Sequence, residues 1–253
     1  MKRRYALRDD QWLRIKDLLP GREGSVGVTA KDNRLFIEAV LYRYRAGIPW
    51  RDLPTRFGDF RVVHTRFTRW AKQGIWNSIF QQLAADADNE YAMIDEPDCS
   101  RPPTQCWRKR GDAPKEAIGR SRGGLSTKIH ATVDALGNPL SFYLTPGQAS
   151  DLEGADELLT NLQAKTIIAD KGYDADERVR DLLKNQDKTP VIPCKKNRKM
   201  VDSYDRELYK ARHLIENFFA RLKQYRAIAT RYDKRATNFL GGIYLAAIVV
   251  WLN

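Results

Sequence analysis

Short apolar strands alternate with helices from Tyr91 onward, and this alternation constrains the fold more than any other feature of the 253-residue chain. The expected strands are residues 91–95, two runs on either side of a turn at Leu136–Pro139, residues 166–169 and residues 189–194. The expected helices are residues 150–163 and 174–186, the segment after Leu208 and the apolar C-terminus. This order predicts an α/β fold, a mixed sheet with helices on its faces, for a domain spanning residues 89–253.

Residues 1–88 show helical spacing throughout and are expected to form a separate all-α domain. Segments 51–58 and 60–76, with a turn at Gly58, fit a helix-turn-helix. The second of these helices is expected to bury its apolar side chains, which are Val62, Val63, Phe67 and Trp70. It is expected to expose four cations for contacts with DNA, which are Arg61, Arg66, Arg69 and Lys72. An ordinary helical bundle with a basic surface fits the same pattern.

The charge balance points to an anionic partner. The chain carries 44 Lys and Arg against 32 Asp and Glu, a net charge of +12, and nucleic acid is the commonest partner of such a protein. Three cysteines without a paired framework indicate a reducing compartment, and three scattered histidines argue against zinc. The apolar run Phe239–Leu252 is too short for a membrane span and is expected to be a buried helix. We therefore expect a cytoplasmic protein without a membrane partner.

Two of the expected strands end in aspartate, at Asp95 and Asp170. Ligands of open α/β sheets gather beyond strand ends, so the two carboxylates would share one rim if their strands are neighbours. Each also has a purely structural explanation, as a strand-end cap for Asp95 and as a turn residue before Gly172 for Asp170. Other carboxylates compete for the same role, namely Asp98, Asp134, Asp174 and Asp176.

The segment Leu208–Ala227 predicts a helix with two distinct faces. At about 100° per residue, four polar side chains fall within roughly 60° of one another, and these are Tyr209, Arg212, Glu216 and Lys223. Glu216 is a candidate third carboxylate, although it has the spacing of a simple ion pair with Arg212. Three carboxylates without a histidine cluster suit two divalent cations, Mg²⁺ or Mn²⁺, that promote phosphodiester displacement. Lys171, Arg212 and Lys223 would then hold the DNA backbone.

These residues resemble a bacterial insertion-sequence transposase of the DD(E) type, in the insertion-sequence-five family. The resemblance is carried by DKGYD at Asp170, by the Tyr209-x2-Arg212-x3-Glu216-x6-Lys223 signature, and by IPWRDLPTRFG near the N-terminus. It implies a ribonuclease-H-like core in which Asp95, Asp170 and Glu216 ligate two divalent metals. It further implies that Tyr209, Arg212 and Lys223 position the terminal inverted repeats. Cleavage would expose a 3′-hydroxyl that attacks target DNA directly, and synapsis of two ends would require a dimer or larger assembly.

The chain departs from the family pattern directly after Asp95. Relatives usually continue S-x-I-V-R-A-H-Q-H-S-A-G-A-K, whereas this chain reads EPDCSRPPTQCWRK from Glu96 to Lys109. Codons for the observed segment can be chosen that spell a family-like peptide one base later, which suggests that the segment is translated out of frame, between two compensating indels or through a sequencing error. Pro97, Pro102 and Pro103 argue against a continued regular strand there. The alternative function is therefore a catalytically impaired relic or DNA-binding module, and a related nuclease acting on RNA or structured DNA shares the same carboxylates.

Overall fold

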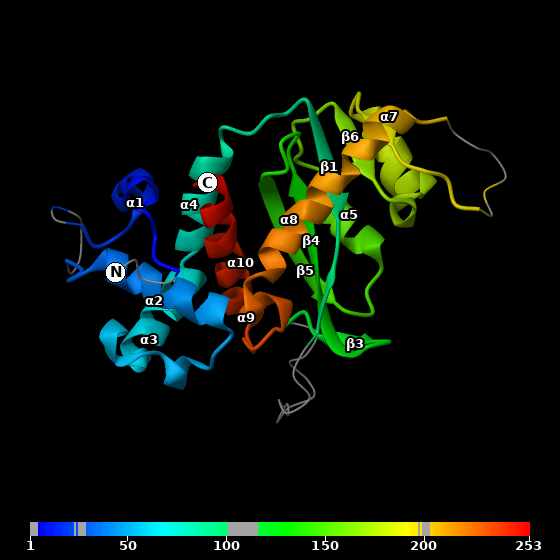
Figure 1. Cartoon of the computed structure of the whole chain (residues 1–253). Helices are drawn as coiled ribbons and strands as arrows, with labels where there is room; N and C mark the ends of the chain where they lie inside the picture. Colours follow the sequence, from blue (N-terminus) through cyan, green and yellow to red (C-terminus); the bar gives the residue numbers. More distant parts are fainter. Residues whose placement is uncertain (1–4, 23, 25–28, 101–115, 197, 199–202) are drawn as a thin grey trace. The chain divides into compact units, whose positions relative to one another are not determined.

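The computed structural model describes residues 5–22, 24, 29–100, 116–196, 198 and 203–253 (Figure 1). The chain divides into two compact units. We call the first, Met1–Ala85 with Leu222–Asn253, the helical unit, and the second, Asp86–Arg221, the sheet unit. The sequence predicted that residues 89–253 form one domain, but the structure groups residues 222–253 with the N-terminal helices. No helix within the described ranges has the length and apolar character needed to cross a membrane.

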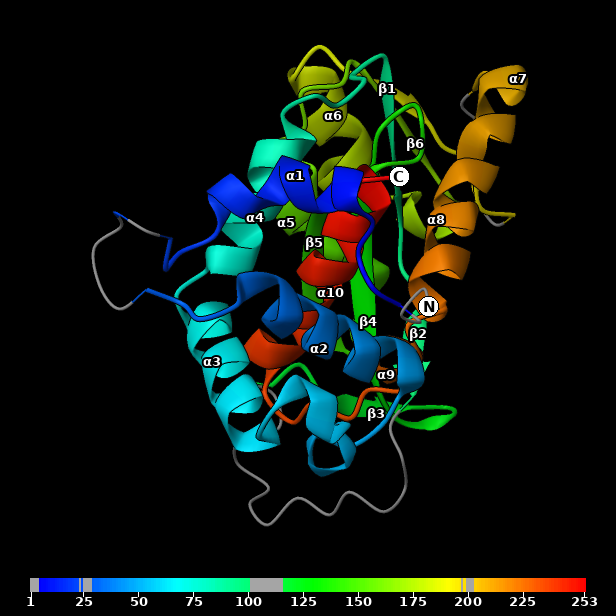
Figure 2. The same cartoon turned by 60° about the vertical axis from the view of Figure 1, so that its left-hand side comes forward.

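The helical unit is built around its C-terminal helix. Its α-helices are α1 (Asp9–Ile15), α2 (Asn33–Ala46), α3 (Phe60–Lys72), α4 (Ile75–Ala84), α9 (Arg226–Ala229) and α10 (Ala236–Trp251). Helix α10 contacts α2, α3 and α4, and the expectation of a buried C-terminal helix is confirmed (Figure 2). The two ends of the unit are joined where Arg8 Nη1 donates to Asn253 Oδ1 at 2.9 Å. A chain cut at residue 88 would therefore lack the central helix of this unit.

Local sequence explains where these helices begin and end. The Asp32 side chain accepts from Leu35 N and caps α2, and Asp59 accepts from Arg61 N and caps α3. Helix α2 ends at Gly47, which has a φ of 70°. The predicted helix at residues 51–58 is wrong, because the segment forms two 3₁₀ turns, η2 (Trp50–Asp52) and η3 (Thr55–Phe57). Pro54 separates these turns, since proline lacks an N–H and biases the preceding residue away from the helical region.

The sheet unit holds one seven-stranded mixed sheet. Its strands are β1 (Tyr91–Asp95), β2 (Asp98–Ser100), β3 (Gly119–Ser121), β4 (Gly124–Val133), β5 (Pro139–Pro146), β6 (Thr166–Ala169) and β7 (Thr189–Val191). Strand β4 runs antiparallel to β1, β2, β3 and β5, whereas β1, β6 and β7 run parallel to one another. The mixed sheet flanked by helices, expected for a ribonuclease-H-like fold, is confirmed.

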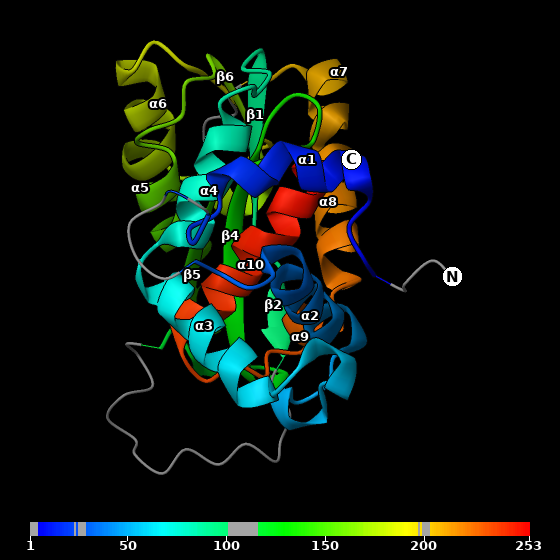
Figure 3. The ribbon, with the colours of Figure 1, turned by 90° about the vertical axis from the view of Figure 1, so that its left-hand side faces the viewer.

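Helices cover both faces of this sheet (Figure 3). One face carries α5 (Asp151–Leu158), η6 (Asp176–Arg180) and α6 (Asp181–Asn185). The other carries α7 (Arg206–Tyr209), η7 (Lys210–Arg212) and α8 (His213–Lys223), which belongs to this unit up to Arg221. The helix expected over Leu208–Ala227 is therefore interrupted by a 3₁₀ turn at η7 and ends at Lys223.

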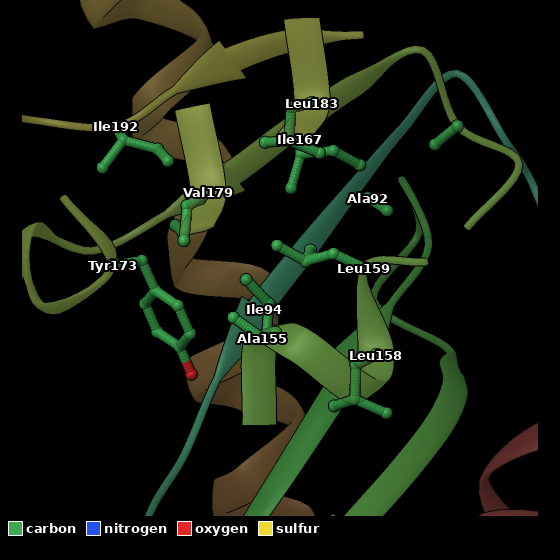
Figure 4. Close-up of a cluster of buried hydrophobic side chains, with 12 residues drawn as sticks. Ala92, Ile94, Ala155, Leu158, Leu159, Ile167, Tyr173, Val179, Leu183 and Ile192 are labelled. Carbon is green, nitrogen blue, oxygen red and sulfur yellow. The ribbon is translucent and has the colours of Figure 1, made fainter. Parts of the chain in front are cut away.

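Side-chain alternation along the strands assigns residues to the two faces. Ala92 and Ile94 of β1 and Ile167 of β6 join a buried cluster with Leu158 and Tyr173 on the α5 side (Figure 4). Successive side chains of a strand point to opposite faces, so Asp95 is directed to the α8 side and Glu96 back to the α5 side. On the α8 side, the rings of Phe142 and Phe218 lie 5.9 Å apart and hold the helix on the sheet.

Candidate active site

Asp95 and Asp170 lie at the carboxyl ends of two adjacent strands. Strands β1 and β6 are parallel neighbours with Ile94 opposite Ala169, so each aspartate occupies the next position along its chain. The sequence placed both carboxylates on one rim on the condition that their strands are neighbours, and this condition is met. Asp170 also begins the 3₁₀ turn η5 (Lys171–Tyr173), where its Oδ1 accepts from Gly172 N at 2.7 Å. The turn explanation for Asp170 is thus correct and compatible with a place at the rim.

Arg212 links the strand end to helix α8. Its Nη1 donates to Asp95 Oδ2 at 3.0 Å, and its Nη2 donates to Glu216 Oε1. The predicted i,i+4 pair of Arg212 and Glu216 is therefore present, but the same guanidinium also holds Asp95. One guanidinium therefore bridges Asp95 at the rim of the sheet and Glu216 on α8.

Asp95 is influenced by both of the other candidate carboxylates. Burial raises the pKa of Asp95 above its ordinary value, Arg212 opposes this, and the charges of Asp170 and Glu216 raise it further. Within the described residues, no three His, Cys, Asp or Glu side chains stand close enough to hold one metal ion. The guanidinium of Arg212 supplies the neutralising charge between Asp95 and Glu216 in this arrangement.

Lys171 and Tyr209 are two more residues of the predicted site. Lys171 follows Asp170 directly and is exposed at the start of η5. Tyr209 ends α7, where burial raises the pKa of its hydroxyl, Arg212 lowers it and Asp170 raises it. The structure therefore brings Tyr209 and Arg212 to the carboxylates. Lys223 is exposed at the last residue of α8, about 10 Å along the helix axis from Glu216.

Two further acidic residues, Glu96 and Asp151, lie on the α5 side of the sheet. The sequence did not single them out as site residues. Glu96 Oε2 accepts from the Tyr173 hydroxyl, and Asp151 Oδ1 accepts from Lys128 Nζ. The pKa of Glu96 is raised to about 8. Burial is the largest cause, Asp151 and Asp95 raise it further, and the hydrogen bond from Tyr173 opposes the rise. Strand alternation predicts that Glu96 faces away from Asp95, but no local signal predicts its approach to Asp151.

The competing carboxylates have structural roles. Asp134 is fully buried in the β4–β5 turn, where it accepts from the backbone N–H groups of Leu136 and Asn138. Asp174 accepts from Arg180 Nε at 2.8 Å and from Lys195 N at 2.8 Å. Asp176 pairs with Arg198, and Asp98 is exposed on β2. These bonds occupy the buried carboxylates within the folded core rather than at the rim.

The segment after Asp95 is described only as far as Ser100. The sequence argued against a continued regular strand here, and β1 does end at Asp95; a separate three-residue strand, β2, follows at residues 98–100. Proline can still accept, and the Pro97 carbonyl receives the Ile129 N–H at 3.2 Å, so pairing with β4 resumes after it. Pro102, Pro103 and Cys106 lie outside the described residues, as does most of the segment proposed to be out of frame.

The cations predicted on the second helix differ in their availability. Arg61, Arg69 and Lys72 are exposed on α3. Arg66 is half-buried, stacks over the Phe36 and Trp70 rings at 4.2 and 4.6 Å and donates to Asn33. Val62 was expected to be buried but is 67% exposed. The reason is geometric, since Val63 faces the core and adjacent residues of a helix differ by about 100°.

Two models of known protein families match this chain. A family model described as "Transposase DDE domain" matches residues 92–252, and one described as "Putative transposase of IS4/5 family" matches residues 7–80. The chain belongs to the DDE transposase family. It is a bacterial insertion-sequence DNA transposase, and these matches favour that function over a DNA-binding module alone.

Related proteins support the same membership. The transposase is 43% identical over 130 residues to "Putative transposase for insertion sequence element IS6501" of Brucella ovis, covering 51% of this chain and all of that protein. It is 27% identical over 148 residues to "Transposase for insertion sequence element IS1106" of Neisseria meningitidis, covering 56% of this chain and 48% of that one. Among solved structures, a pre-cleavage Mos1 transpososome chain aligns over 89% of this chain and 80% of its own, with 11% identity and a TM-score of 0.30.

Proposed function

We propose that this transposase binds the terminal inverted repeats of its element and uses Asp95, Asp170 and Glu216 to cut and transfer DNA strands. The observation that carries the proposal is the placement of two aspartates at the ends of adjacent parallel strands, with Glu216 tied to the first through Arg212. Because the negative charges of Asp170 and Glu216 both act on Asp95, a cation at this rim would relieve their mutual repulsion.

The donor set fits hard divalent cations. Three carboxylates without histidine or cysteine offer only oxygen ligands, which suit Mg²⁺ or Mn²⁺. Asp95, Asp170 and Glu216 would hold two such ions. Bound ions of this kind activate the attacking oxygen and stabilise the departing one. The proposal thus names three side chains as ligands for the divalent metal that the family implies.

The remaining site residues would bind the DNA backbone. Lys171 and Tyr209 lie beside Asp170, and Arg212 lies beside Asp95, so each can approach a phosphate held at the rim. Lys223 would contact the duplex farther along α8. In the cleavage step a water oxygen bonds to phosphorus and the bond to the 3′ oxygen breaks, leaving a 3′-hydroxyl. In the transfer step that hydroxyl attacks a target phosphate, whose own 3′ oxygen departs.

Binding of the ends themselves would involve the exposed cations of α3, which are Arg61, Arg69 and Lys72, while Arg66 supports the helix from its half-buried position. Holding two ends together requires at least a dimer, so we propose a homodimer or larger assembly on DNA. The lack of a paired cysteine framework accords with action in the bacterial cytoplasm, at the nucleoid.

Purified full-length protein, a plasmid carrying both ends of the element, and Mg²⁺ or EDTA provide the test. We expect metal-dependent nicking at the ends, reduced at least 100-fold in Asp95→Asn, Asp170→Asn and Glu216→Gln. Glu157→Gln, an exposed carboxylate on α5, is the matched control and should cut normally. Binding without metal-dependent cutting by the unmodified chain would indicate the impaired DNA-binding module. Equal cutting of RNA or random duplex would indicate a general nuclease.

A further inference from the structure

Val62 is the most exposed large apolar side chain within the described residues, at 67%. Single exposed apolar residues are common on protein surfaces and by themselves indicate nothing. Val62 differs in its surroundings, because it lies on the outer face of a helix whose other exposed positions are cationic or hydroxyl-bearing. Helix α3, residues Phe60–Lys72, contains no Asp or Glu at all.

The exposed residues of α3 form one stripe, which we call the α3 stripe. It consists of Arg61, Val62, Thr65, Arg69 and Lys72. Val62 and Arg69 are seven residues apart and so differ by only about 20° around the helix. A shallow hollow borders the same face and is lined in part by Thr65, Arg69 and Lys72. An apolar methyl pair therefore shares a face with a long cationic side chain about 10 Å farther along the helix, and Arg61 precedes it in the chain.

The inner face of α3 fixes the direction of this stripe. Val63, Phe67 and Trp70 are buried, and the Trp70 ring lies 5.1 Å from that of Trp76 and 5.0 Å from that of Phe36. The Asp59 side chain turns back to cap the helix by accepting from Arg61 N at 2.8 Å. The nearest acidic residue in sequence thus caps the helix, and α3 itself carries no acidic side chain to offset its cations.

We propose that the α3 stripe enters the major groove of the terminal repeats and that Val62 recognises the C5-methyl group of a thymine. This rests on the proposed function, namely that the chain binds DNA. A helix fits the major groove, and the thymine methyl is the apolar group presented there. Every other base edge would set Val62 against donors or acceptors that it cannot satisfy. Arg69 then contacts the neighbouring base edge, and Arg61 and Lys72 contact phosphates.

A protein partner fits the stripe less well. The cores of protein–protein interfaces are depleted of charged residues, whereas the stripe that carries Val62 also carries three cations, Arg61, Arg69 and Lys72. Polyanionic DNA complements those cations, and its grooves present a methyl group at the scale of one valine. We therefore commit to duplex DNA as the occupant, with a second copy of the chain as the outcome that would contradict it.

The test removes methyl groups from each side of the proposed contact. Full-length protein selects duplexes from a random pool, and one selected duplex is remade with each thymine replaced in turn by deoxyuridine, which lacks the methyl group. Fluorescence anisotropy should show binding weakened about three- to tenfold at one thymine position. The Val62→Ala variant should bind the thymine duplex more weakly by a similar factor. Replacing that thymine by deoxyuridine should not weaken its binding further. Leu13→Ala, the matched exposed apolar residue of the same unit, should change neither affinity.

The outcomes separate this inference from the function on which it rests. Val62→Ala remains compatible with the helix because alanine is the better helix former, so loss of folding does not confuse the result. A variant that still responds to deoxyuridine as the unmodified chain does would overturn the role of Val62 and leave DNA binding intact. A variant with normal DNA affinity but weakened self-association would assign the stripe to a protein interface. Absence of DNA binding by the unmodified chain would refute the proposed function itself.

Discussion

Breaking the ion pair between Arg43 and Asp233 should unfold the helical unit under conditions where the sheet unit survives. Arg43 Nη1 donates to Asp233 Oδ2 at 2.8 Å, and the Tyr44 hydroxyl donates to the same oxygen at 3.0 Å. The two side chains are only 2% and 5% exposed. Asp233 comes from the segment before α10 and Arg43 from α2, so the pair joins the C-terminal part of the unit to its N-terminal part.

Asp233→Asn preserves shape and a hydrogen-bond acceptor but leaves the Arg43 guanidinium buried without a counter-charge. At an effective dielectric constant near 20, two unit charges 4 Å apart attract by about 4 kcal/mol. Removing one member of a buried pair typically costs about 3–5 kcal/mol. We therefore expect Asp233→Asn to lower the free energy of unfolding by about 3–4 kcal/mol. This is a large share of the ~5–15 kcal/mol that stabilises an ordinary domain.

Urea denaturation followed by tryptophan fluorescence is the assay, because five of the six tryptophans fall within the bounds of the helical unit. With a slope of about 2 kcal/mol per molar urea, the midpoint should fall by roughly 1.5–2 M. Asp17→Asn, which breaks an exposed pair with Arg22 in the same unit (70% and 50% exposed), should change stability by less than about 0.5 kcal/mol. A double replacement, Arg43→Met with Asp233→Leu, should recover much of the loss. If Asp233→Asn matches the unmodified chain, the reasoning about this unit is wrong.

Four other changes test the sheet unit. Arg212→Gln removes a positive charge from between two proposed metal ligands, so Mn²⁺ should bind the DNA-free protein about tenfold more tightly in an electron paramagnetic resonance titration; equal or weaker binding contradicts this. Gly172→Ala places a Cβ 2.8 Å from the proposed catalytic aspartate before it and should reduce cleavage at least tenfold with DNA binding retained, whereas Gly123→Ala, with only a 3.9 Å contact, should not. His130 is buried with a pKa lowered to about 4, so the unfolded state binds its proton first; stability should fall by up to about 3 kcal/mol as pH drops from about 6.5 to 4, and His130→Gln should flatten that slope in calorimetry. Glu96 has the opposite sign, since its pKa of about 8 lies above the unfolded value; in EDTA, stability should fall as pH rises from about 4.5 to 8, and Glu96→Gln should be the more stable protein at pH 9.

Much of the sheet unit was predictable because its signals are local. Strands β1 and β6 each end on an aspartate, and an apolar run with a polar end shows this directly in the sequence. The pairing of these two strands is not a local property, since 70 residues separate them. Only the condition under which their carboxylates would meet was predictable. The helix after Leu208 was predicted with the correct apolar face, and its 3₁₀ turn at η7 was missed because intrinsic helix preference does not reveal tertiary contacts.

The missed features arise from contacts between distant segments. Glu96 and Asp151 meet only after β1 and α5 pack together, so no spacing rule reveals them. The grouping of α10 with the N-terminal helices depends on Arg43 and Asp233, which are 190 residues apart in the chain. Val62 was misassigned for a simpler reason, since it was placed on the buried face together with Val63, whereas the two differ by about 100° around the helix and only Val63 faces the core.

The two roles expected of Arg212 exclude each other at any one moment, and this links metal binding to DNA binding. Its guanidinium now holds Asp95 and Glu216, the side chains expected to ligate cations, yet it is also expected to hold a DNA phosphate. Cations at the rim would take over the neutralisation of the carboxylates and release the guanidinium for the phosphate. Metal should therefore raise the affinity for DNA, and by thermodynamic reciprocity DNA should raise the affinity for metal by the same factor. In such a site the cations and the phosphate-binding arginine are all in place for catalysis only when both the nucleic acid and the metal are bound.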